Sequence, residues 1–119
     1  MQPIITLCGS TKFKTEFLSV AQRLGEKGWL VISLTNFTHA DTLDTTKETE
    51  AMLDAIHMQK IMMSDSIYVI NKDGYIGEAT LRAIAFAIVL RKSIIFFELP
   101  ASSIKSMMDT IKAEYGRLI

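Results

Sequence analysis

The sequence predicts an α/β fold with a parallel sheet, and three observations lead to this prediction. Short apolar runs alternate with longer segments of helical periodicity along the 119 residues. Glycine or proline separates several of these segments, as at Gly9, Gly28 and Pro100. The apolar runs contain few polar positions, which is typical of strands that helices cover on both faces. Strands that alternate with helices in this way indicate βαβ units.

Four strands and four helices are expected. In chain order they are a strand at 4–8, a helix at 11–27, a strand at 29–34, a helix from 46, a strand at 66–71, a helix at 79–91, a strand at 93–97 and a helix after Ser102 or Ser103. Each strand is a short apolar run, rich in β-branched or aromatic residues, between turn signals. Residues 35–45 are polar and long for a connection, so we expect a functional loop there.

The first helix is defined by the spacing of its apolar residues. Phe13, Phe17, Val20 and Leu24 recur at intervals of four, three and four, which places them on one helix face. Gly28 closes the helix, as glycine commonly does.

The later helices carry signals of other kinds. Thr45 and Glu48 fit a capping box, so the second helix is expected to begin at Thr46. The helix at 79–91 is apolar nearly all round and must therefore be covered on both sides. The sheet covers one side, and either a partner subunit or the last helix covers the other. We expect a homodimer or larger homo-oligomer through this helix.

The simplest strand order for this pattern is 2-1-3-4, in a doubly wound, three-layer α/β/α arrangement of the flavodoxin-like or Rossmann-like type. In this order the chain reverses direction between the first and third strands. Ligands of open α/β sheets bind at that point, beyond the carboxyl ends of the strands. A glycine turn follows each of these two strands, at Gly9 and at 74–77. Topology and local sequence thus predict the same small-molecule site.

Composition limits the classes of function. The length fits a single domain over residues 1–119, and 13 basic residues balance 13 acidic ones, so long nucleic acid is not an expected partner. One cysteine leaves no internal disulfide and fits a reducing compartment. The first residues lack the pattern of a signal peptide, and the longest apolar run, 83–90, is too short to span a bilayer. We therefore expect no membrane partner and a cytoplasmic location.

The first glycine turn contains Gly9, Ser10, Thr11 and Lys12. Two hydroxyls, a helix N-terminus and a lysine charge together suit an anion such as phosphate. The alternative is a strand end followed by an ordinary helix cap. The spacing matches neither a P-loop nor a dinucleotide-binding fingerprint.

The second glycine turn contains Gly74, Gly77, Glu78 and Thr80, which would form a ligand loop. Its alternative is a tight turn in which Glu78 stabilises the positive end of a helix. Tyr75, in the same turn, would stack on the ring of a ligand or remain an ordinary exposed tyrosine.

His57 is the candidate acid or base on the second long helix, at the edge of its apolar stripe. Asp54, three residues earlier, would orient it, and the alternative is a half-buried, hydrogen-bonded histidine. The histidine and aspartates of 35–45 match no metal motif, so no metal site is expected. Cys8 ends a buried strand and is expected to be an apolar filler.

Several of these segments together resemble the nucleoside 2-deoxyribosyltransferase-like superfamily. They are Cys8-Gly9-Ser10-Thr11, the Gly-Trp-Leu-Val after the first helix, the Ser-Asp before the third strand and Gly-Tyr-Ile-Gly-Glu-Ala-Thr before the third helix. The likeness covers roughly residues 4–98 and is strongest to small phage and bacterial members. It implies binding of a nucleotide or nucleoside and cleavage or transfer of its N-glycosidic bond, without a cofactor. The superfamily includes hydrolases that act on deoxynucleoside monophosphates.

The sequence departs from the superfamily pattern at two positions. The glutamate that attacks or stabilises the anomeric carbon falls at Ala83, and the assisting aspartate falls at His57, eight residues before Asp65. Glu78 replaces the missing carboxylate only if it lies before the helix, since residues five apart on a helix point about 140° away from each other. The expected function is nucleotide or nucleoside binding with glycosidase or deoxyribosyltransferase ancestry, with Glu78 and His57 as catalytic candidates. The alternative is an inactive binding or sensing module.

Overall fold

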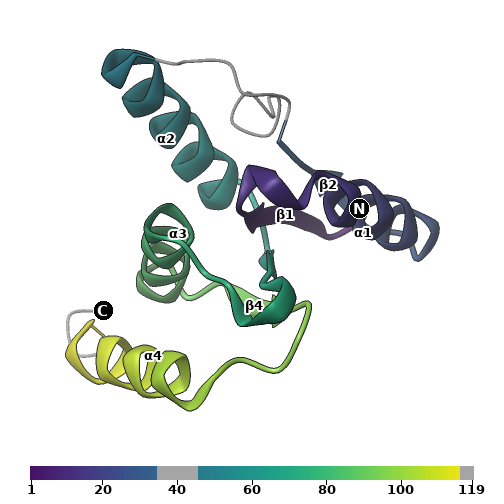
Figure 1. Ribbon diagram of the computed structural model, residues 1–119. Coiled ribbons are helices and arrows are strands. Elements are labelled where there is room, and N and C mark those ends of the chain that lie inside the picture. Colours follow the sequence, from purple (N-terminus) through teal and green to yellow (C-terminus); the bar gives the residue numbers. More distant parts are fainter. Residues whose placement is uncertain (35–45, 116–119) are drawn as a thin grey trace.

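The computed structural model describes residues 1–34 and 46–115, which form a four-stranded α/β fold (Figure 1). In chain order the elements are β1 (Ile4–Gly9), η1 (Thr11–Phe13), α1 (Lys14–Glu26), β2 (Leu30–Ile32), α2 (Lys47–Met62), β3 (Ser66–Ile70), η2 (Lys72–Gly74), α3 (Glu78–Val89), β4 (Ser93–Phe96) and α4 (Ser102–Tyr115), where η marks a 3-10 helix. The sheet order is β2-β1-β3-β4, and all three strand pairs are parallel. The predicted order and fold class are confirmed.

Two helices begin one position away from the prediction. Thr46, not Thr45, is the N-cap of α2, and its Oγ1 accepts a hydrogen bond from the N–H of Thr49 at 3.1 Å. The last helix begins at Ser102 itself, and the carbonyl of Ala101 accepts its first backbone hydrogen bonds. For α2 the cause is that two neighbouring threonines offer nearly equal caps, whereas α4 begins directly after Ala101, one residue before a serine cap would start it.

Side chains of the central strands alternate between the two faces of the sheet and build two core clusters. The α1-side cluster consists of Ile5, Leu7, Phe13, Phe17, Val20, Leu24, Tyr68 and Ile70. The α3-side cluster consists of Cys8, Ile61, Ile67, Val69, Ala83, Ile84, Ala87 and Ile88. The four residues that predicted the first helix are all buried in the α1-side cluster, so this prediction is confirmed.

Helices are distributed unequally over the sheet (Figure 1). α1 alone covers one face, whereas α2, α3 and α4 contribute to the cluster on the other. Along β4, Ser93 and Ile95 are exposed while Ile94 and Phe96 are half-buried, because α1 does not reach this edge strand. The expectation that helices cover every strand on both faces is therefore wrong for β4.

α3 lies between α2 and α4 and also contacts the sheet. Met107, Met108 and Ile111 of α4 pack against the α3-side cluster, so the chain itself supplies cover that had been expected from a partner subunit. The homo-oligomer through 79–91 stays a prediction. No helix within residues 1–34 and 46–115 is long and apolar enough to cross a membrane.

Candidate functional site

The two glycine turns start from neighbouring points at the carboxyl ends of β1 and β3. Gly9 lies opposite Ile70 in the parallel ladder. A Cβ atom at Gly9 would lie 2.9 Å from the carbonyl oxygen of Ile70, and the Gly9 φ of +154° also disfavours a side chain. Glycine thus lets the two strands stay close at the point where both loops begin.

The loops also touch beyond the sheet. The ammonium nitrogen of Lys12 lies 3.4 Å from the centre of the Tyr75 ring, and Phe13 meets the same ring edge-on. A salt bridge of 2.6 Å joins Lys72 to Glu16 of α1. The predicted convergence of the two loops is therefore confirmed.

A cavity of about 440 Å³ opens beside these loops, between α2 and α3. Its volume lies within the range of about 300–1,000 Å³ that is common for small-molecule sites. The lining residues are Gly9, Thr11, Leu34, Glu50, Leu53, Asp54, Ile56, His57, Lys60, Glu78, Ala79, Thr80 and Arg82. The cavity lies at the strand ends where topology predicted a ligand.

Half of the predicted site residues line this cavity: Gly9, Thr11, His57, Glu78 and Thr80. The other five do not line it and have structural roles in the two loops. Ser10 caps η1 by accepting a hydrogen bond from the N–H of Lys12 at 3.3 Å. Lys12 and Tyr75 form a cation–π contact. Gly74 adopts the left-handed backbone conformation at the end of η2, and Gly77 is the N-cap of α3.

The amino end of α3 faces the cavity with unsatisfied donors. Glu78, Ala79 and Thr80 form its first turn, and their backbone N–H groups have no acceptor within the described part of the chain. The glycine cap offers no side-chain acceptor. Free N–H groups and the positive end of a helix dipole suit an anionic or hydroxyl-rich ligand.

α2 presents the opposite wall of the cavity. Glu50, Asp54, His57 and Lys60 follow one another at intervals of three or four residues, so they share one helix face. The Nδ1 atom of His57 is buried and has no hydrogen-bond partner within residues 1–34 and 46–115. Burial, aided by the positive charge of Lys60 and opposed by Asp54, lowers the pKa of His57 from its ordinary value of 6.5. The imidazole is consequently neutral at pH 7 and can accept a proton.

Two interactions fix the cavity walls relative to each other. A salt bridge of 3.1 Å joins Arg82 of α3 to Asp54 of α2. The Lys60 ammonium donates to the carbonyl oxygen of Ser33, just beyond β2, at 3.0 Å. Asp54 is expected from the sequence to orient His57. In the structure its carboxylate forms the salt bridge with Arg82, and the Nδ1 of His57 accepts no hydrogen bond from the described residues.

The structure separates Ala83 from Glu78. Ala83 is fully buried in the α3-side cluster and does not line the cavity, whereas Glu78, the first residue of α3, is exposed and does. Cys8 is also buried in that cluster, and burial raises the pKa of its thiol to about 12. Glu78 and His57 are the predicted acid-base groups that reach the cavity.

Sequence reasoning missed the cavity residues Glu50, Lys60 and Arg82. Helical spacing could have found them, since Lys60 lies three residues after His57 and Arg82 lies four residues after Glu78. The polar loop expected to be functional, 35–45, lies outside the described residues. Among those described, no three His, Cys, Asp or Glu side chains form a group that could hold a metal ion.

Comparisons with protein-family models, with curated proteins and with solved structures find no match for this chain.

Proposed function

We propose that the protein binds a nucleotide or nucleoside in the cavity between α2 and α3, with N-glycosidic bond cleavage or transfer as its ancestral chemistry. One observation carries the proposal. The Nδ1 of His57 and the N–H groups at the start of α3 line the same cavity at the switch point of the sheet, and none of them has a hydrogen-bond partner within residues 1–34 and 46–115. Buried polar groups are normally hydrogen-bonded, so a ligand is their natural partner.

The cavity lining is suited to both ends of such a ligand. The turn at Gly9 and Thr11 and the first turn of α3 would hold phosphate and sugar hydroxyls through N–H groups and the Thr80 hydroxyl. Leu53 and Ile56 give the cavity an apolar part on which a base ring would rest.

For an active enzyme, Glu78 and His57 take complementary roles. The carboxylate of Glu78 stands in the first turn of α3, at the positive end of the helix dipole, and lines the cavity. It would attack, or electrostatically stabilise, the anomeric carbon as the bond to the base nitrogen breaks. The base leaves with the bonding electron pair and takes up a proton from water. Where Glu78 has formed a bond to the anomeric carbon, that bond breaks when the next hydroxyl attacks the same carbon. His57, neutral at pH 7, would remove a proton from the water or acceptor hydroxyl that then joins the anomeric carbon.

The second candidate is a binding or sensing module without turnover, and Ala83 favours it. At this position the resembled superfamily carries its carboxylate, and here a methyl group is packed in the core. Such a module would keep the loops and their free donors but lack the family route to covalent transfer.

The test combines binding with turnover. The protein is melted with a panel of deoxynucleoside monophosphates, nucleosides, free bases and inorganic phosphate, and each mixture is then analysed by chromatography for released base. A raised Tm with base release supports the enzyme, and a raised Tm without release supports the binding module. At a ligand concentration of 100 Kd the gain in stability is about 2.7 kcal/mol. A flat Tm and no release across the panel reject both functions.

Matched variants assign the effect to this cavity. Glu78→Gln is expected to remove base release while retaining binding, and His57→Gln to weaken both. Glu114→Gln changes an exposed carboxyl of α4 that does not line the cavity, and should match the wild type. Equal loss in the Glu114 variant would show that the effect does not arise at this site.

A further inference from the structure

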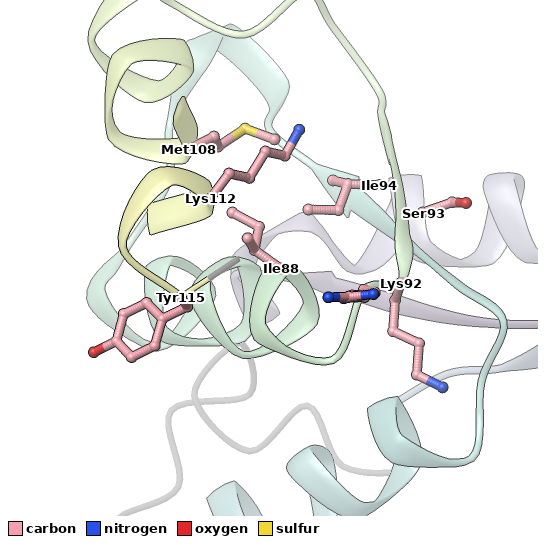
Figure 2. A pocket seen from close by; sticks show the side chains of 8 residues that line it. Ile88, Lys92, Ser93, Ile94, Met108, Lys112 and Tyr115 are labelled. Atoms are coloured by element: carbon pink, nitrogen blue, oxygen red, sulfur yellow. The ribbon is translucent and has the colours of Figure 1, made fainter. Parts of the chain in front are cut away.

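A second cavity lies at the opposite end of the strands, beside the amino end of β4 (Figure 2). Its volume is about 480 Å³. The lining residues come from the end of α3, the start of β4 and the last two turns of α4: Ile88, Arg91, Lys92, Ser93, Ile94, Met108, Lys112 and Tyr115. None of them belongs to the candidate site between α2 and α3.

The floor of this cavity is apolar. Ile88, Ile94 and Met108 extend toward one another from α3, β4 and α4, and Lys112 reaches in beside them (Figure 2). Ile94 and Met108 are only half-buried, so apolar surface remains open to a ligand. A volume of this size accepts a small organic molecule rather than a single ion.

The rim of the cavity is positively charged. Arg91, Lys92 and Lys112 line it, and no Asp or Glu side chain of the described residues does. The side chains of these three residues form no salt bridge within residues 1–34 and 46–115. The carboxyl ends of α3 and α4 contribute about half a negative charge each. The three positive side chains exceed this combined negative charge of about one by about two charges. Neutralising the negative helix ends therefore does not explain why all three cations gather here.

Arg91 occupies a position where the backbone favours glycine. It follows the C-cap of α3 with φ of +59°, and its N–H donates to the carbonyl oxygen of Ile88 at 3.0 Å. The N–H of Lys92 donates to the carbonyl oxygen of Ala87 at 2.8 Å, which completes a Schellman motif. An arginine here is conformationally strained, and residues held in this region cluster at functional sites.

We propose that this cavity binds a small organic dianion with an apolar body, such as an aryl or alkyl phosphomonoester. The apolar body rests on Ile88, Ile94 and Met108. The phosphate lies between Arg91 and Lys112, where charge-assisted hydrogen bonds and the excess positive charge stabilise it. This site is separate from the candidate nucleotide site, because the two share no lining residue.

The experiment is a titration of the whole protein followed by backbone amide NMR. The probes are phenyl phosphate, inorganic phosphate and benzyl alcohol, which separate the complete ligand from its charged and apolar halves. Phenyl phosphate is expected to give saturable shifts at Arg91, Ser93 and Lys112. Each half alone should bind at least tenfold more weakly. Equal affinity for inorganic phosphate, or shifts confined to 9–11 and 78–80, would overturn the proposal.

Two variants complete the test. Arg91→Gly removes the charge and relieves the strained backbone, so its Tm should equal or exceed that of the wild type while its affinity for phenyl phosphate falls at least fivefold. Lys105→Gln removes an exposed α4 charge that does not line the cavity, and its affinity should be unchanged. Wild-type affinity in the Arg91 variant, or an equal loss in the Lys105 variant, contradicts the proposed site.

Discussion

The ammonium nitrogen of Lys12 lies 3.4 Å from the centre of the Tyr75 ring and joins the loops that follow β1 and β3. A cation over an aromatic face at an exposed site contributes about 0.5–1 kcal/mol. Tyr75→Ala should therefore lower the free energy of unfolding by about that amount or more, since the contact of Tyr75 with Phe13 is lost as well. Tyr75→Phe keeps the ring and should remain close to the wild type in urea unfolding. Equal stability of the Ala and Phe variants would show that the ring contact contributes nothing.

Gly9→Ala should destabilise the fold by about 1–3 kcal/mol, because its Cβ would meet the Ile70 carbonyl oxygen at 2.9 Å in a strained backbone. Gly25→Ala is the matched control, since no atom lies within 4 Å of a Cβ atom at this helical position. It should stabilise by about 0.5–1 kcal/mol. Denaturant unfolding measures both variants, and an unchanged midpoint for Gly9→Ala would contradict the close approach of β1 and β3.

Ala83→Glu should not restore a catalytic carboxylate. The side chain would enter the α3-side cluster, where Ala83 is fully buried, and an unpaired charge there destabilises by about 3 kcal/mol or more. Ala55→Glu, at an exposed position of α2, should melt near the wild-type temperature. Base release by a stable Ala83→Glu protein would mean that position 83 reaches the cavity after all.

Stability should fall between neutral and mildly acidic pH through His57. Its folded-state pKa lies below the unfolded value of 6.5, so the unfolded chain binds more protons as the pH drops through that value. The contribution of His57 is therefore present above pH 6.5 and lost below it. Thermal melts from pH 7.5 to 5.5 should show a smaller decline for His57→Gln than for the wild type. Parallel declines would mean that the imidazole is not buried.

Cys8 should not react with thiol reagents in the folded protein. Burial raises the pKa of its thiol to about 12, so almost no thiolate is present at pH 8, and the residue is fully buried. A colorimetric disulfide reagent should detect no thiol in native protein and one per chain in denaturant. Rapid native labelling would contradict the burial.

The sequence was sufficient for the fold because its signals are local. Glycine stops such as Gly9 and Gly28 and the spacing of Phe13, Phe17, Val20 and Leu24 act within a few residues of each element. The strand order followed from connection rules that hold for most parallel sheets.

The site was only partly predictable, because the packing of elements that are distant in the sequence decides which side chains line the cavity. Lys12, which is expected to bind phosphate, lies over the ring of Tyr75, a residue far along the chain, and no signal in the sequence indicates this contact. Arg82 looked like one polar position on an apolar helix, and its pairing with Asp54 depends on how α2 and α3 lie side by side. No local pattern encodes that arrangement.

The division of the core between the two faces of the sheet has a consequence for how this protein can change. The α1-side cluster and the α3-side cluster lie on opposite faces of the strands, and the effects of distant substitutions without shared partners add. Substitutions in α2, α3 or α4, the helices around the two cavities, affect the packing of the α3-side cluster only. These substitutions are therefore expected to leave the packing between α1 and the sheet unchanged.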